Sequence, residues 1–460
     1  MTDLIESTLG GLSGQLGNQV SKPGDDQYVA ATGIWAKPTG RMPRTVVHCR
    51  TLQDIQLAIA AARSAGLPLS VRGGGHDWAG RALCDGLVID LGGMRDVVIS
   101  GNRRSAEILG GALASDVLAV TDPLGLAAVT GSCSAVGMAG LSLGGGYGPL
   151  IGRFGLALDN LIAADVVLAD GRFVTVEHGR EEDLFWPLRG GGGNFGVVTA
   201  MRIRLHELPN VVSGMLVYPF SEAKAVLRRY ADAVPSMPDE LTVQVGAVAG
   251  PDGVPVILLV PTWSGSQGKG DEHMAPLLGL GTLLDNTLDA VRYGTSLSVF
   301  DSYVANGQRT FMETCSLPAL DGAGADLLVE AMAKAVSDGC AIFSHEFKGA
   351  ASRVPVETTA FGLRRNHVLI EILASFPDRA DGLEERRHQQ WVRDTRRAFD
   401  AIALPGGYPN LLASGDTDRA AESFGPNVDR LARVKQLYDP ENVFCSAIPL
   451  PLGRRVIAAE

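Results

Sequence analysis

Residues 71–76 read Val-Arg-Gly-Gly-Gly-His, and this short stretch decides how the whole chain is interpreted. The run 67–72 predicts a strand that ends at the three glycines. Glycine runs let backbone N–H groups approach an anion closely, as they do in pyrophosphate sites. A histidine directly after such a turn, His76, is therefore a candidate cofactor residue, although a lone histidine there is more often part of a core or loop.

Two more glycine-rich stretches lie further along the chain. Residues 131–148 read Gly-Ser-Cys-Ser-Ala-Val-Gly-Met-Ala-Gly-Leu-Ser-Leu-Gly-Gly-Gly-Tyr-Gly, and residues 189–196 read Arg-Gly-Gly-Gly-Gly-Asn-Phe-Gly. The chain holds 57 glycines in 460 residues, whereas about 7% is usual. Three such runs favour a dinucleotide site over ordinary turns. The third fits the Rossmann pattern by letter, but a predicted strand follows it where that fold needs a helix, and no Gly-Lys-Ser/Thr P-loop is present.

The composition excludes several classes of protein. Forty basic against 51 acidic residues give a net charge of −11, which argues against nucleic-acid binding. No stretch is typical of a secretory signal or a membrane span, so we expect a cytoplasmic protein with no membrane partner. Six cysteines stand far apart without metal-ligand spacing, which predicts no metal site and mostly small buried side chains.

The pattern of predicted elements changes near residue 207. Before it, short strands and a helix alternate over residues 44–130, a hairpin is predicted at 161–176 and a strand at 197–205. After it, strands are predicted at 254–260 and 367–373, with helices at 324–336, 383–402 and 427–438. No low-complexity linker separates the two parts. We therefore expect two closely apposed domains with a site between them.

The motifs together resemble one known family. Residues 71–76, followed by Gly80 and the segment 85–91, resemble the covalent-flavin segment of the berberine bridge enzyme-like group, which belongs to the vanillyl-alcohol oxidase type of FAD-linked oxidoreductases. Residues 131–148 are similar to its Gly-x-Cys-x-x-Val-Gly-x-x-Gly stretch, and residues 438–444 to its C-terminal signature. The resemblance implies an α+β fold of two domains. These are an FAD-binding domain, 1–207 with 425–460 returning to it, and a substrate domain, 208–424, with an antiparallel sheet covered by helices.

The resemblance also implies how the flavin is held. His76 would bond the flavin 8α-methyl carbon and Cys133 would bond C6, which places the chain in the bicovalent subgroup. Val136 stands where a small residue lets O₂ reach the flavin, which favours an oxidase. The other implied cofactor-binding residues are Arg72, Gly73, Gly74, Gly75, Asp77, Gly131, Ser132, Gly137, Gly140, Gly144, Gly145, Gly146, Tyr147, Asn194, Gly196, Val197, Val198 and Asn442.

The expected function is an FAD-dependent oxidase that acts on a small-molecule substrate. Hydride would pass from a substrate C–H to flavin N5, and O₂ would reoxidise the flavin and give H₂O₂. The expected substrate carbon is an alcohol or hemiacetal of a bulky natural product or sugar. Amine oxidation of the 6-hydroxynicotine oxidase kind, a flavin-dependent dehydrogenase and a flavin-binding protein without turnover remain alternatives. We expect a monomer or homodimer.

One family feature is missing, and it leaves the catalytic base open. Alcohol-oxidising members commonly carry Tyr-x-Asn-Tyr, whose last tyrosine takes the substrate proton, whereas this chain reads Tyr-Pro-Asn-Leu at 408–411. Glu371 is the first candidate base, although a solvent-facing edge-strand Glu is as good an interpretation. Tyr408 and Tyr147 follow, and Tyr293 is weaker. The sequence Cys-Ser-Ala at 445–447 is a second departure, because the family usually has Arg and then Asn there.

The remaining histidines and the arginine-rich segment are expected to have no part in the site. His206, His345 and His367 show no ligand spacing to one another and are interpreted as ordinary residues. The arginines at 386–397 are expected on a solvated helix face.

Overall fold

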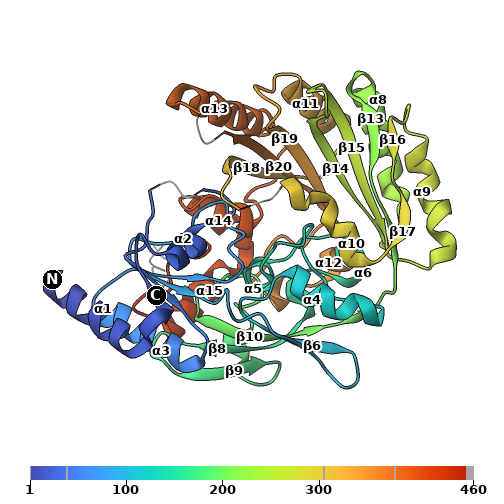
Figure 1. Cartoon of the computed structure of the whole chain (residues 1–460). Helices are drawn as coiled ribbons and strands as arrows, with labels where there is room; N and C mark the ends of the chain where they lie inside the picture. The colour runs from blue at the N-terminus through green and yellow to red at the C-terminus, as the bar shows by residue number, and fades with distance from the viewer. Residues whose placement is uncertain (1, 38–39, 304–305, 378–379, 452–460) are drawn as a thin grey trace, which may run out of the picture.

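The computed structural model describes residues 2–37, 40–303, 306–377 and 380–451. The chain forms two lobes, each built on its own β-sheets (Figure 1). The first lobe contains the N-terminal region and the C-terminal helices. The second lobe carries one large sheet with helices along its outer face (Figure 1).

A four-stranded sheet opens the first lobe. Its strands lie in the order β1 (Val20–Ser21), β2 (Thr45–His48), β4 (Leu87–Asp90) and β3 (Leu69–Arg72). Strands β2 and β3 both pair parallel with β4, so their carboxyl ends meet at one edge. Helix α3 (Leu52–Ser64) crosses between β2 and β3, and it begins at a capping box formed by Thr51 and Asp54. Helix α1 (Thr2–Leu16) packs on α3.

A five-stranded antiparallel sheet completes the first lobe. Its order is β5 (Val97–Ile99), β6 (Ser105–Leu109), β10 (Val197–Arg204), β8 (Leu161–Val167) and β9 (Phe173–Glu177). The predicted hairpin at 161–176 is present as β8 and β9. The other elements here are α2 (Asp26–Thr32), α4 (Ala114–Thr121), β7 (Leu126–Ala127), α5 (Met138–Gly144), α6 (Ile151–Phe154), α7 (Glu182–Phe185) and β11 (His206–Glu207).

The second lobe is organised around an antiparallel sheet from residues 211–376. Its main path runs β16 (Asp285–Asn286), β13 (Leu216–Pro219), β15 (Pro255–Trp263), β14 (Leu241–Ala249), β19 (Cys340–Phe347), β20 (His367–Phe376) and β18 (Arg309–Leu317), with β12 (Val211–Ser213) and β17 (Asp289–Val291) beside it. Helices α8 (Ala223–Ala233), α9 (Gly270–Leu278), α11 (Gly322–Met332) and α13 (Gly382–Ala398) contribute to the core that covers one face. The expected antiparallel sheet covered by helices is confirmed.

The chain then returns to the first lobe. Helices α14 (Thr417–Phe424) and α15 (Val428–Tyr438) supply Phe424 and Leu431 to the core of the five-stranded sheet. Leu412 belongs to the same core. The boundary at residue 424 stays a prediction, and these contacts favour a return before residue 412. The short helices α10 (Tyr293–Leu297) and α12 (Ala350–Arg353) lie where the lobes meet.

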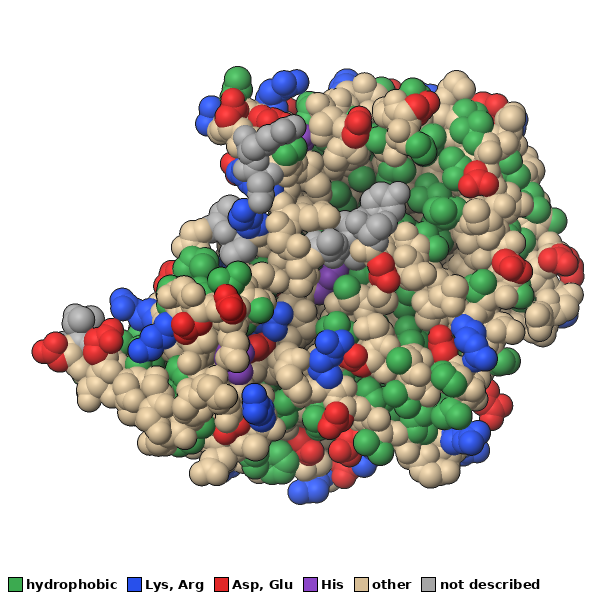
Figure 2. All heavy atoms as spheres, viewed as in Figure 1, with side chains coloured by type: hydrophobic (Ala, Val, Ile, Leu, Met, Phe, Trp, Pro, Cys, Tyr) green, Lys and Arg blue, Asp and Glu red, His purple; other side chains and the backbone are tan. Residues whose placement is uncertain are grey.

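None of the helices in the described ranges is both long enough and apolar enough to cross a membrane. On the face in Figure 2, acidic and basic side chains are interspersed, and the surface is hollowed between the lobes. The described residues also hold no group of three His, Cys, Asp or Glu side chains that could bind a metal.

Candidate active site

A cavity of about 590 Å³ lies between the two lobes. The first lobe contributes the loop after β3, the residues around α5 and the glycine run that precedes β10. The second lobe contributes the inner face of β14, β18, β19 and β20. Fourteen of the predicted cofactor residues line it: Gly73, Gly74, Gly75, His76, Asp77, Gly131, Ser132, Cys133, Val136, Gly137, Gly140, Tyr147, Gly196 and Val198.

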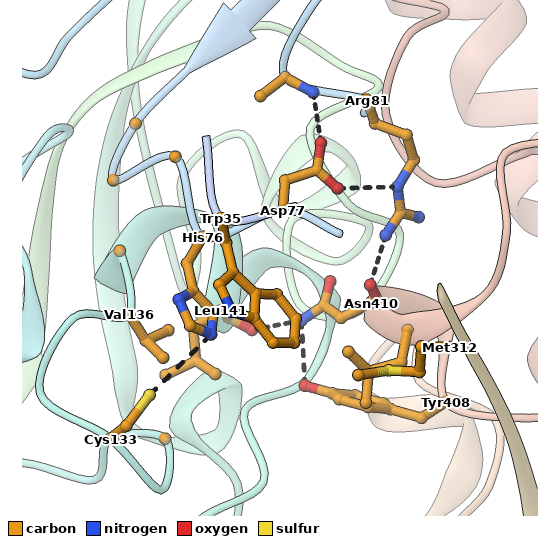
Figure 3. A pocket seen from close by; sticks show the side chains of 18 of the residues that line it. Trp35, His76, Asp77, Arg81, Cys133, Val136, Leu141, Met312, Tyr408 and Asn410 are labelled. Carbon is orange, nitrogen blue, oxygen red and sulfur yellow. Dashed lines mark hydrogen bonds and ion pairs between the residues drawn. The ribbon is translucent and has the colours of Figure 1, made fainter. Parts of the chain in front are cut away.

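His76 and Cys133 face one another in this cavity, although 57 residues separate them in the chain. The Sγ of Cys133 lies 3.9 Å from Nε2 of His76 (Figure 3). The indole of Trp35 stacks on the imidazole with a centroid distance of 4.6 Å and an interplanar angle of 4°. Nδ1 of His76 is buried and has no hydrogen-bond partner among the described residues. The two side chains are thus neighbours on the cavity wall that the first lobe forms.

Burial sets the protonation of both groups. It lowers the pKa of His76 to about 4, so the imidazole is neutral at neutral pH. Burial, with the nearby charge of Asp301, raises the pKa of the Cys133 thiol to about 12. Asp301 also holds the loop that carries Cys133, because its carboxylate accepts bonds from the Ser134 backbone N–H (3.0 Å) and hydroxyl (2.6 Å).

Glycine is required where two of the glycine-rich stretches cross. A Cβ on Gly74 would lie 2.5 Å from the Cα of Gly137, and a Cβ on Gly137 would lie 2.6 Å from the Gly74 nitrogen. Only two glycines allow the backbones to approach this closely. This contact places the His76 turn against the Cys133 loop.

The segment after the second lobe closes another side of the cavity. Arg81 donates to the carbonyls of Pro409 (3.2 Å) and Asn410, and Trp78 Nε1 donates to the carbonyl of Leu411 (3.1 Å). The Asn410 amide donates to the hydroxyl of Tyr408 (3.0 Å) (Figure 3). Leu411, which stands where the family carries tyrosine, lines the cavity. The departure at 445–447 also lies at the site, because Ser446 and Ala447 line it.

Tyr408 and Tyr147 lie together at the base of the cavity. The Tyr408 hydroxyl accepts the Gly146 N–H at 2.9 Å, and the Tyr147 hydroxyl lies 2.5 Å from Nε2 of His367. Burial raises the pKa of both phenols. Neither phenol is therefore ionised at neutral pH. Tyr293 is bonded to Thr130 (2.9 Å) and does not line the cavity.

The second lobe supplies a polar row opposite His76 and Cys133. Glu371 on β20 lines the cavity, and its Oε1 lies 3.2 Å from Nε2 of His345 on β19. The same nitrogen lies 3.2 Å from Nε2 of Gln244 on β14. The negative charge of Glu371 acts to raise the pKa values of His76, Cys133 and Tyr408, although burial outweighs this effect at His76. The carboxylate therefore lies within electrostatic reach of all three groups.

Sequence reasoning missed two members of this row. His345 was expected to be an ordinary residue, and Gln244 carried no motif at all. They meet Glu371 because β14, β19 and β20 are adjacent, with Gln244 opposite His345 in register. The one signal that could have identified them is that every second side chain of a strand points to the same face of the sheet. That signal can be used only when the pairing of the strands is known.

Seven predicted cofactor residues lie outside the cavity lining. Gly144, Gly145 and Gly146 are packed against Asn410, Tyr408 and Ala157, so they give space to protein atoms. Arg72 pairs with Asp90 at 2.7 Å, and the Asn194 amide donates to the Gly191 and Ile448 carbonyls. Val197 is a core residue, and Asn442 is an exposed turn residue at φ +54°. These positions shape the backbone around the site.

The chain is similar in sequence to known families and proteins. A family model described as an FAD binding domain matches residues 43–177, and one described as berberine and berberine like matches residues 403–451. (R)-6-hydroxynicotine oxidase from Paenarthrobacter nicotinovorans is 29% identical, over 93% of this chain and 95% of the relative.

Solved structures match the whole fold. That of 6-hydroxy-D-nicotine oxidase from Arthrobacter nicotinovorans has a TM-score of 0.85 and 27% identity, covering 94% of this chain and 97% of its own. A chitooligosaccharide oxidase structure has a TM-score of 0.84 with 22% identity and 98% coverage of both chains, which shows the shared fold.

The cavity fits FAD by its own geometry. The orphaned Nδ1 of His76 is a buried polar atom that lacks a partner in the protein. Gly140 has no heavy atom within 4 Å of the position of an added Cβ, and Gly193 has only Ala447, at 3.7 Å. Both glycines line the cavity, and neither has a side chain that would fill it. A planar cofactor can therefore approach the backbone closely at these two positions.

Proposed function

Because this chain belongs to the berberine bridge enzyme-like FAD-linked oxidoreductases, we propose that it is an oxidase that takes hydride from a hydroxyl-bearing carbon of a bulky small molecule. The observation that carries the proposal is the position of Glu371. Its carboxylate lines the same cavity as His76 and Cys133 and faces them from the opposite lobe. A titratable base in that place replaces the one lost at Leu411.

His76 and Cys133 would hold the FAD covalently. The Cys133 Sγ and the His76 Nε2 lie 3.9 Å apart on one wall, which supports attachment of both side chains to one ring. The neutral state of His76 supports attachment through nitrogen, because an uncharged imidazole carries a free lone pair. FAD supplies the two-electron acceptor that O₂ regenerates, so the overall reaction is R₂CHOH + O₂ → R₂C=O + H₂O₂.

The residues of the second lobe would manage the substrate proton. Glu371 would accept the proton of the substrate hydroxyl while hydride leaves the carbon that bears this hydroxyl. This general base catalysis lowers the barrier to hydride transfer. His345 would fix the carboxylate's direction by donating its Nε2–H to Glu371 at 3.2 Å, and the Gln244 amide lies beside the same nitrogen. The buried phenol of Tyr408 would serve as a wall and a hydrogen-bond donor, since burial keeps it protonated. The phenol of Tyr147 would serve as a wall only, because its proton is donated to His367.

Acid precipitation of the purified protein, followed by peptide mass spectrometry, tests the attachment. We expect flavin in the pellet on peptides that contain both His76 and Cys133. Flavin on His76 alone would contradict the bond to Cys133. Flavin released entirely into the supernatant would contradict covalent attachment altogether.

Substitution of the proposed base tests the reaction. We expect Glu371→Gln to slow anaerobic substrate-driven bleaching of the flavin by roughly 10²–10⁴-fold, while the visible spectrum of bound flavin is kept. Glu330→Gln is the matched control, because Glu330 is an exposed carboxylate on α11. An unchanged bleaching rate in Glu371→Gln would exclude Glu371 as the base. Stoichiometric H₂O₂ on admission of air is the expected sign of an oxidase, and its absence would indicate a dehydrogenase.

Amine oxidation is the second candidate, and the carboxylate of Glu371 also favours it. An anionic side chain in a largely apolar cavity would attract an ammonium group, and a relative of this chain is named for a nicotine-derived amine. The same bleaching assay separates the two candidates. Reduction by secondary amines and not by alcohols would establish the second candidate in place of the first.

A further inference from the structure

We propose that the substrate is an alcohol with an apolar, aromatic or alicyclic skeleton and a single polar end, and not a sugar. This inference rests on the proposed function and narrows its substrate class. It comes from the order of side chains along the inner face of the second-lobe sheet. That face changes from polar to apolar within two to four residues along β14, β19 and β20.

The polar end of this face is the row of Gln244, His345 and Glu371. Gln244 lies opposite His345 in the register of β14 and β19. Glu371 on β20 lies opposite Phe343, which is two residues from His345 on β19. These side chains face the wall that carries His76 and Cys133. The reacting C–OH of a substrate would therefore lie between Glu371 and that wall.

The next row along the strands is apolar. Ala341, Leu373 and Met312 lie opposite one another on β19, β20 and β18, and Val248 extends the row on β14. We call these four residues the apolar row. Leu373 and Val248 are only partly buried in the protein, so each presents hydrophobic surface to the cavity. A substrate body that covers them gains from the removal of this surface from water.

Two phenylalanines lie between the apolar row and the polar row of Gln244, His345 and Glu371. Phe343 and Phe300 both line the cavity, and their rings meet edge to face at a centroid distance of 6.0 Å and an angle of 86°. Gly246 leaves the space that Phe343 occupies, because a Cβ there would lie 2.9 Å from the Phe343 ring. This arrangement presents aromatic surface beside the position of the reacting carbon, which suits an aryl or alicyclic ring.

A sugar would be poorly matched by the same surface. It carries a hydroxyl on nearly every carbon, and each buried hydroxyl needs a hydrogen-bond partner. The apolar row offers none from its side chains. Beyond it, the Ser375 hydroxyl is already bonded to Thr310 at 2.9 Å, and Asp338 is exposed at the cavity mouth.

The test uses the flavin-loaded enzyme and two substrate classes. Anaerobic bleaching is followed with 1-(2-naphthyl)ethanol and cinnamyl alcohol, and with xylobiose and chitobiose at equal concentrations. We expect the aryl alcohols to exceed the sugars at least 10-fold in the apparent second-order rate constant. Faster bleaching by either sugar overturns the inference while leaving the oxidase proposal standing.

A binding measurement keeps the inference independent of turnover. The ketone 2-acetonaphthone is titrated into the enzyme and its binding is read from the shift of the flavin absorbance. We expect Leu373→Asn to raise its Kd roughly 10–200-fold, since that is the usual effect of a mismatched side chain in an apolar pocket. Leu437→Asn, on the exposed face of α15, is the matched control and should leave Kd unchanged.

The outcomes separate the two proposals. If neither alcohol bleaches the flavin but the ketone binds and Leu373→Asn weakens it, the apolar substrate class holds and the alcohol oxidase proposal fails. If the ketone causes no spectral shift, or if Leu373→Asn leaves its Kd unchanged, the inference is overturned whatever substrate reduces the flavin.

Discussion

Single residues in this protein act mainly through how closely they let other groups approach. Gly74 and Gly137 carry no ligand-binding side chain, yet their contact brings the His76 turn to the Cys133 loop. Trp35 fixes the plane of the His76 ring from one side. The chemistry expected of His76 and Cys133 therefore depends on neighbours whose own role is steric.

The steric role of Gly74 leads to a prediction about stability. Gly74→Ala should lower the free energy of unfolding by about 1–3 kcal/mol, because the added methyl meets the backbone of Gly137 and the crossing segments must separate. The measurement is urea unfolding followed by fluorescence. Gly10→Ala is the control, because Gly10 lies in α1 with open space around it and should gain up to about 1 kcal/mol. Equal effects in the two variants would contradict the prediction.

At the scale of elements, the exposed edge of the large sheet is closed by arginine side chains. Strand β18 ends the main path, and the carbonyl of Thr314 on that strand accepts bonds from Arg396 Nε (3.1 Å) and from Arg419. Arg419 also donates to the carbonyl of Gly406, close to the segment that carries Tyr408. From the charge pattern at 386–397 we expect Arg396 on a solvated helix face. That expectation is wrong for Arg396, because an unpaired edge carbonyl draws its guanidinium onto the sheet.

Removal of one of these donors should loosen the edge strand. Arg419→Met keeps the aliphatic stem but removes the donors, so we expect the free energy of unfolding to fall by about 2 kcal/mol, the usual value for a bond from a charged group. Hydrogen exchange in β18 should become faster. Arg387→Met, an exposed position on α13, serves as the control. Unchanged exchange in β18 would show that Arg419 does not hold the edge.

At the scale of the whole molecule, the two lobes are joined by a buried aromatic core that also contains titratable groups. Tyr147, Phe347 and Phe361 pack there beside His367. The ring of His367 lies 2.7 Å from the carbonyl of Arg365 through Nδ1 and 2.5 Å from the Tyr147 hydroxyl through Nε2. Both contacts suit the neutral imidazole, and burial lowers the pKa of His367 to about 4.

This buried histidine makes the stability of the molecule depend on pH. An unfolded histidine titrates near 6.5, so between pH 6.5 and 4 the unfolded chain binds a proton that the folded chain does not. The contribution of His367 to stability should be constant above pH 6.5 and fall by roughly 3 kcal/mol as the pH decreases to 4, at about 1.4 kcal/mol per pH unit. Urea midpoints at pH 7.5 and 5.0 measure the effect. His367→Gln should remove this contribution and make the dependence less steep, whereas the exposed His178→Gln should not. The same slope in all three proteins would exclude His367 as its source.

The sequence by itself determined the cofactor and the outline of the fold. The glycine-rich stretches, His76, Cys133 and residues 438–444 are motifs that can be read along the chain, and they carry the resemblance that implies FAD. The apolar run at 367–373 likewise predicted a strand that carries Glu371. The hairpin at 161–176 was a local prediction and the helix-covered antiparallel sheet was implied by the resemblance, and both are confirmed.

Only the tertiary structure decided which residues share the site with Glu371. Gln244, His345 and Glu371 are separated by 101 and 26 positions in the chain, and they meet because three strands pair in one register. The apolar row arises in the same way, from residues on four strands. Strand pairing depends on the energy of the whole sheet and leaves no motif in any one segment, so the sequence predicted the cofactor wall while the fold alone assembled the wall that faces the substrate.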